Sequence, residues 1–202
     1  MKKIDKDLNF LKLSAVYSLH LKILEKYISI LKSHDFFKSG VIVGSFAKKC
    51  SDRLSDLDII LFVNSDKVNE AFEEIRNKQF FPVLHRFEAN EKNGNTYEKT
   101  IYDNFISVEI HIFGENSQFK LKNPYINFFG SHKVVEKFLS NPIQAEIPSK
   151  SIDINLHLGW TIYGLLKTWI RGDENNTIVN FIKVSDMLKN NQDLSEVKSK
   201  IT

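Results

Sequence analysis

Residues 41–63 have the sequence VIVGSFAKKCSDRLSDLDIILFV. The run Val41-Ile42-Val43 is β-branched and bounded by glycines, which is typical of a short buried strand. Residues 57–63 are apolar at almost every position, which predicts a second strand, buried on both faces, at the centre of a sheet. Gly44-Ser45 ends the first strand and predicts a turn into a helix. This stretch therefore predicts two core strands with a polar connection between them.

The flanking sequence predicts the remaining elements. Apolar residues recur at three- and four-residue intervals over residues 8–31, which is the period of an amphipathic helix. Strands are expected at 82–87, 97–102 and 105–113, the last two joined by a tight hairpin at Asp103-Asn104, and helices at 66–78, 131–139, 152–171 and 174–189. Otherwise the chain after Gly114 is expected to be irregular. The prediction is an α+β fold, with a small mixed β-sheet flanked by helices in residues 1–125 and a helical C-terminal region in residues 126–202.

Composition narrows the class of protein. The 28 Lys and Arg residues and 25 Asp and Glu residues are spread along the chain, whereas nucleic-acid binding usually needs a concentrated basic face. The single cysteine, Cys50, excludes an internal disulfide. Charged residues directly after the start interrupt any signal-peptide core, and the apolar run 59–63 is far shorter than the ~18 residues of a membrane span. We therefore expect a cytoplasmic protein with no membrane segment and no nucleic-acid partner.

Gly44-Ser45 has the residue types of a phosphate-binding turn. A strand followed by Gly-Ser and a helix places backbone N–H groups and a hydroxyl where an anion is favoured, and glycine lets a phosphate approach closely. The alternative is a simple strand-to-helix turn with a serine cap. Lys48, in the following turn, is a candidate phosphate contact or an exposed helix lysine.

Three carboxylates form the candidate catalytic and metal-binding set. Asp56 and Asp58 are one residue apart in a strand context, so both point to the same side, and a bound divalent cation would explain two like charges there. The alternative is a solvated strand end. Glu109 lies mid-strand and supplies the third carboxylate if its strand neighbours the first, although strand alternation also allows it to face solvent. One or two Mg²⁺ ions would suit this oxygen-rich set.

These motifs carry a family resemblance. An apolar strand, Gly44-Ser45, and then Asp56-x-Asp58 with apolar residues after it resemble the signature of the DNA polymerase β-like nucleotidyltransferase superfamily. The resemblance implies a small mixed sheet with helices, Mg²⁺ held by the two aspartates, and the phosphates of ATP or another NTP at Gly44-Ser45. It also implies transfer of a nucleotidyl group to an acceptor hydroxyl.

The longer run from Gly44 to Asp58 resembles bacterial antibiotic nucleotidyltransferases of the lincosamide and aminoglycoside type. Weaker likeness to the larger lincosamide enzymes extends to Lys167 and Arg171, which lie four apart on one predicted helix face. These two residues are candidate triphosphate contacts, and a solvated basic stripe explains them nearly as well. The chain ends soon after the second C-terminal helix, where that family continues, so the acceptor pocket is expected to be either reduced or completed by a second subunit in a homodimer.

The expected function is transfer of a nucleoside monophosphate, AMP from ATP as the first choice, to a hydroxyl of a small-molecule acceptor such as an antibiotic. Two alternatives stay open. One is nucleotidyl transfer to a protein or RNA, as in toxin-antitoxin systems. The other is a nucleotide-binding module that has lost turnover.

Overall fold

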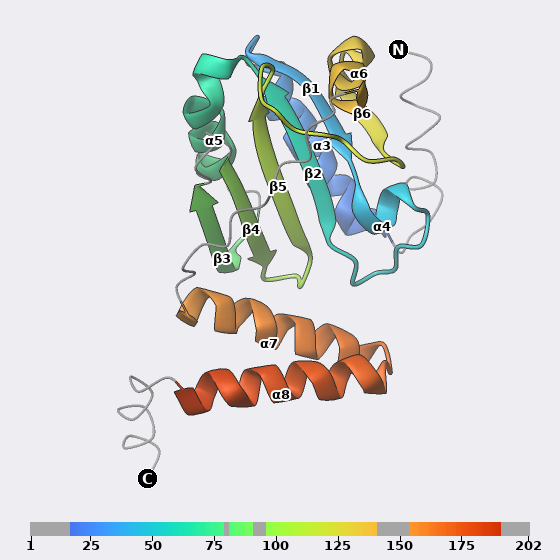
Figure 1. Cartoon of the computed structure of the whole chain (residues 1–202), viewed down its shortest axis with the longest axis vertical. Coiled ribbons are helices and arrows are strands. Elements are labelled where there is room, and N and C mark those ends of the chain that lie inside the picture. Colours follow the sequence, from blue (N-terminus) through green and yellow to red (C-terminus); the bar gives the residue numbers. More distant parts are fainter. Residues whose placement is uncertain (1–16, 79–80, 91–95, 141–153, 191–202) are drawn as a thin grey trace. The chain divides into compact units, whose positions relative to one another are not determined.

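The computed structural model describes residues 17–78, 81–90, 96–140 and 154–190 (Figure 1). The chain divides into two compact units, Met1–Pro148 and Ser149–Thr202. This division differs from the boundary predicted after residue 125, because residues 126–140 pack with the sheet of the first unit. Each unit has its own arrangement of elements.

The first unit contains a mixed six-stranded sheet with the order β3-β4-β5-β2-β1-β6. Its strands are β1 (Phe37–Ile42), β2 (Leu57–Val63), β3 (Val83–Asn90), β4 (Thr96–Tyr102), β5 (Ser107–Gly114) and β6 (Ile126–Gly130). The central pair, β2 and β5, is parallel, and all other neighbours are antiparallel. The expected α+β class with a small mixed sheet and helices is therefore confirmed.

Helices cover both faces of this sheet (Figure 1). On one face, α3 (Ser18–Lys32) and α5 (Val68–Asn77) pack their apolar sides against the sheet. On the other face, α6 (His132–Ser140) contributes Val135 and Phe138 to a smaller cluster with Ile60 and Phe62 of β2. Because α6 covers only part of its face, polar residues can lie at the remaining end, where β2 begins.

Two features of the first unit differ from the prediction. The segment after Gly114 contains β6, a strand that the prediction treated as irregular. Its apolar run is only a few residues long and lies between Pro124 and Gly130, so the sequence resembles a loop until pairing with β1 supplies its hydrogen bonds. In addition, the β4–β5 connection is longer than the tight hairpin expected at Asp103-Asn104, because it also includes Phe105 in a left-handed conformation.

The second unit is a pair of helices, α7 (Ile154–Ile170) and α8 (Glu174–Asn190), which were both predicted. Gly172 lies between them with φ +70°, as expected for a residue that ends a helix. Several large apolar side chains on the two helices are exposed, namely Ile162, Leu166, Trp169, Ile170, Ile178, Val179, Phe181, Ile182 and Leu188. The expected homodimer stays a prediction.

No helix in the described ranges combines the length and the apolar character of a membrane-crossing segment.

Phe138 tests the assignment of α6 to the core of the first unit. Its ring is 2% exposed and stacks on Phe62 with 4.2 Å between ring centroids. We expect Phe138→Ala to lower the free energy of unfolding by about 3–5 kcal/mol, because it removes the side chain and leaves a cavity. Urea denaturation measures the loss, and Lys137→Ala on the exposed side of the same helix is the control. Equal stability of the two variants would contradict this packing.

Candidate active site

The Gly44-Ser45 turn lies at the start of β2. β1 ends at Ile42, and the next backbone N–H, that of Val43, donates to the carbonyl of Asp58 at 2.9 Å. The antiparallel pairing of β1 with β2 thus brings the end of one strand beside the beginning of the other. The helix that follows, α4 (Gly44–Ala47), is a single turn, so the full helix dipole assumed for phosphate binding is not present here.

Gly44 is required where it stands. Its φ of +66° is a left-handed conformation that other residues rarely adopt. A Cβ atom added at this position would also collide with the side-chain carboxylate of Asp58. The bare α-carbon therefore makes room for this carboxylate at the turn, which couples the two motifs that the sequence placed fourteen residues apart.

Hydrogen bonds hold the connection between the Gly44-Ser45 turn and β2. Some are within the connection, and others join it to α3 and to Tyr17 just before that helix. Ser55 donates from Oγ to Asp52 Oδ1 at 3.0 Å, and the backbone N–H of Asp52 donates to Ser55 Oγ at 2.8 Å. The buried ring of His20 lies with Nε2 2.9 Å from the Ser55 carbonyl, and Tyr17 donates its hydroxyl to the Ser51 carbonyl at 2.8 Å. These bonds fix the backbone that leads directly into Asp56.

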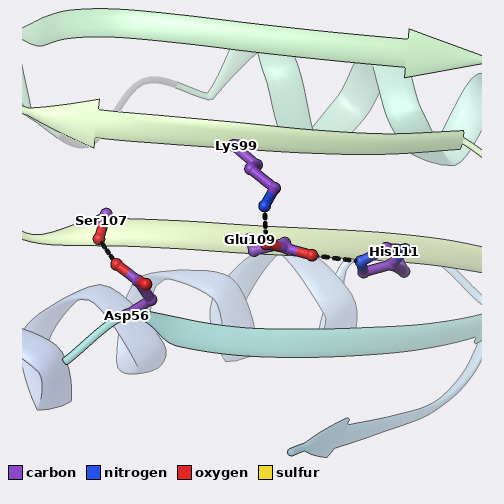
Figure 2. A network of polar contacts seen from close by, with 5 residues as sticks. All are labelled: Asp56, Lys99, Ser107, Glu109 and His111. Atoms are coloured by element: carbon purple, nitrogen blue, oxygen red, sulfur yellow. Dashed lines mark hydrogen bonds and ion pairs between the residues drawn. The ribbon is translucent and has the colours of Figure 1, made fainter. Parts of the chain in front are cut away.

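The two aspartates and the glutamate lie along one edge of neighbouring strands. Asp58 of β2 is in register with Glu109 of β5 in the parallel ladder, so their side chains are on the same face. Adjacent strands are about 4.8 Å apart, which brings the two residues side by side. Asp56 precedes β2 and accepts a hydrogen bond from the buried Ser107 Oγ at the start of β5 (Figure 2). The fold thus sets Asp58 beside Glu109 and brings Asp56 to the first residue of β5, while the use of the three carboxylates as one site stays a prediction.

Glu109 is held by two side chains (Figure 2). Lys99 reaches across from β4, and its Nζ lies 2.6 Å from Glu109 Oε2. His111, two residues along β5, places Nε2 2.7 Å from Glu109 Oε1. Tyr97 stacks on the His111 ring with 5.1 Å between centroids. Both carboxylate oxygens therefore already have a partner.

The charge of Glu109 follows from these contacts. Burial alone would raise its pKa, but the His111 hydrogen bond and the charge and hydrogen bond of Lys99 outweigh it and lower the pKa from 4.5 to about 2. The carboxylate is thus ionised throughout the neutral range, as a metal ligand or an acceptor of hydrogen bonds must be. Because this pKa is far below neutral, Glu109 is a weak general base while both contacts persist.

The other predicted site residues divide between the units. Ser45 is half-buried in the turn and Lys48 is exposed at its end, so both lie within one helical turn of Gly44. Lys167 and Arg171 belong to the second unit. Lys167 is buried, with Nζ 5.1 Å above the Tyr163 ring, whereas Arg171 is exposed. Their part in nucleotide binding stays a prediction.

Sequence reasoning missed Lys99 and Ser107 as members of this site. A hairpin of two residues would set Lys99 opposite Val108, whereas the longer connection sets it opposite Glu109. The signal in the sequence was weak, because Phe105 occupies the left-handed position that usually attracts glycine or asparagine. The proximity of Ser107 to Asp56 follows from the parallel register of β2 and β5, which the sequence does not specify.

The types of donor suit a divalent cation, because the carboxylate oxygens of Asp56, Asp58 and Glu109 are hard ligands. The present contacts of Glu109 do not, because the Lys99 ammonium already balances its charge. Among the residues whose placement is described, no three His, Cys, Asp or Glu side chains are gathered closely enough to hold a metal ion as they stand.

Comparison with known proteins identifies no family or relative for this chain. No protein-family model matches the sequence, and a search of curated proteins gives no significant match.

Gly44→Ala tests the coupling between the turn and Asp58. We expect a loss of stability beyond the roughly 1–2 kcal/mol of a left-handed non-glycine residue, because the new methyl group also displaces the Asp58 carboxylate. Gly172→Ala is the matched control, since Gly172 has a similar φ of +70° but nothing within 4 Å of the added Cβ. Urea denaturation measures both variants. A loss for Gly44→Ala no larger than that for Gly172→Ala would contradict the close approach.

Glu109→Gln tests the charge at this position. A carboxyl group with a lowered pKa stabilises the fold fully above its unfolded pKa, near 4.5, and loses that contribution as the pH falls towards 2. We expect the variant to be less stable than the wild type by on the order of 1–3 kcal/mol at neutral pH, with the difference shrinking in acid. Urea denaturation in the presence of a chelator measures it. A difference that is independent of pH would contradict the role of charge.

Proposed function

We propose that this chain is a Mg²⁺-dependent nucleotidyltransferase with the nucleotidyltransferase fold. In this proposal it transfers a nucleoside monophosphate, AMP from ATP as the first candidate, to a hydroxyl of a small molecule, with antibiotics as the first acceptors to test. In this proposal the protein is an ATP-binding, magnesium-binding transferase with a role in antibiotic resistance. The resemblance of residues 44–58 to that superfamily supports the class of reaction.

One observation carries the proposal. The parallel register sets Asp58 beside Glu109, and the Gly44 turn makes room for the Asp58 carboxylate at the same end of β2. A structural role alone does not explain why a glycine in a left-handed conformation lies against one carboxylate while a second carboxylate is in register with the first on the neighbouring strand. Such an arrangement suits a phosphate chain whose charge is balanced by a cation.

Each residue has a role in the proposed transfer. Asp56 and Asp58 would hold Mg²⁺, which supplies charge neutralisation and polarises the phosphoryl group. The turn at Gly44-Ser45 would bind the NTP phosphates through its backbone and hydroxyl groups. The acceptor oxygen forms a bond to the α-phosphorus, the bond to the bridging oxygen breaks, and pyrophosphate leaves. Glu109 would orient the acceptor hydroxyl and accept its hydrogen bond, with the proton passing finally to solvent.

Incubation with ATP, Mg²⁺ and a panel of lincosamides and aminoglycosides tests the proposal, with mass spectrometry as the readout. We expect an acceptor whose mass increases by one nucleoside monophosphate, and a rate at least about 100-fold lower for Asp58→Asn, because charge stabilisation is the main contribution to such transfer. Asp66→Asn, exposed beyond the other end of β2, is the control and should retain the rate.

Labelled NTPs and cell lysate extend the same test to macromolecules. A labelled protein or RNA that disappears with Asp58→Asn would keep the reaction and change the class of acceptor. If folded wild-type protein modifies neither small molecules nor macromolecules with any of the four NTPs, the proposal of nucleotidyl transfer is wrong. Nucleotide binding without pyrophosphate release would then indicate a binding module.

A further inference from the structure

Lys99 contacts the carboxylate that the proposed metal site would use. Its ammonium group lies 2.6 Å from Glu109 Oε2 (Figure 2). Glu109 is in register with Asp58, so the contact lies on the face of the sheet that carries Asp58. Neither the resemblance to nucleotidyltransferases nor the composition of the chain indicated Lys99.

The register of the β4–β5 hairpin fixes this contact. Lys99 and Glu109 are directly opposed in the antiparallel ladder, and Glu109 is directly opposed to Asp58 in the parallel ladder. The three residues thus form one row across three strands. The side chains of Lys99 and Glu109 are 25% and 22% exposed, so water and salt screen their attraction less than that of a surface pair.

The charges in this row explain what the ammonium group does. Asp58 and Glu109 are like charges on adjacent strands, and Asp56 adds a third carboxylate at the same edge. A partly buried group of carboxylates repels itself unless a cation lies among them. Lys99 supplies such a cation from within the chain, and its charge-assisted hydrogen bond orients Glu109 towards β4.

We propose that Lys99 is a positioning residue that competes with a divalent cation for Glu109. In the cation-free protein the ammonium group neutralises Glu109 and turns it towards β4; when the cation binds Asp56 and Asp58, Glu109 exchanges one partner for the other. The inference rests on the proposed function only in taking these carboxylates to bind a divalent cation. It predicts that Lys99 weakens cation binding, which is the opposite of the effect expected of a residue that only stabilises the site.

Titration of the full chain with Mn²⁺, without nucleotide, tests this directly. Electron paramagnetic resonance measures free Mn²⁺, and so the readout does not depend on catalysis. We expect Lys99→Met to bind Mn²⁺ about tenfold more tightly than the wild type, because a positive charge a few ångströms from the ion is removed. Lys99→Arg should bind like the wild type. Lys67→Met removes a lysine that is paired with Glu70 at the surface, and it should leave the affinity unchanged.

A double-mutant cycle separates competition for Glu109 from a general effect of charge. In a Glu109→Gln background, the neutral amide no longer prefers either cation, so Lys99→Met should change Mn²⁺ affinity by much less than tenfold. Lys99→Gln replaces Lys99→Met if the latter fails to fold, as judged by circular dichroism. If Lys99→Met and Lys99→Gln bind Mn²⁺ with an affinity equal to or weaker than that of the wild type, the inference is overturned. Undetectable Mn²⁺ binding in the wild type and in both of these variants would overturn it as well.

Failure of the inference about Lys99 and failure of the proposed nucleotidyl transfer give different results. If the wild type transfers a nucleotidyl group but Lys99→Met binds Mn²⁺ no more tightly, only the inference about Lys99 is wrong. If Lys99→Met binds Mn²⁺ more tightly while no acceptor is ever modified, the competition stands and the proposed reaction is wrong.

Discussion

The parallel pairing of β2 with β5 is the constraint on which the site depends. It fixes Asp58 beside Glu109, and it brings Ser107 to Asp56 at the beginning of the two strands. A shift of this register by one residue would turn Glu109 to the opposite face, which is packed against α3 and α5. The apolar residues of β2 and β5 that fill that core therefore also determine which carboxylates meet.

The position of the Gly44 turn depends on the other neighbour of β2, the antiparallel strand β1. β1 pairs with β2, so its last residues end where Asp58 begins its strand. The absence of a side chain at Gly44 is then a requirement of packing against the Asp58 carboxylate, as well as of backbone conformation. The part of the face farther along β2 is covered by α6 and apolar side chains. Along β2, the polar residue of this face therefore lies at the end where the strand begins.

The sequence predicted part of this arrangement of residues, and the reasons for success and failure are physical. The apolar run after Asp58 identified a central strand, whereas Asp56 lies one residue before that strand. That Asp56 and Asp58 hold one cation stays a prediction. Pairing between strands depends on long-range contacts and on the length of each connection. The unusual conformation of Phe105 lengthened one hairpin by a residue and thereby brought Lys99, which the sequence analysis did not consider, to Glu109. Likewise, β6 is too short to be recognised until β1 supplies its partner.

The proposed function requires Mg²⁺ and an NTP to bind at the end of the sheet that carries Gly44, Asp58 and Glu109. Paramagnetic broadening of backbone amide resonances by Mn²⁺ with a non-hydrolysable ATP analogue measures the location of that complex directly. The proposed site predicts that the amides of Gly44, Asp58 and Glu109 broaden first, while those of Asp66 at the far end of β2 stay sharp. Broadening that begins elsewhere, with the Gly44 and Asp58 resonances unaffected, would contradict it.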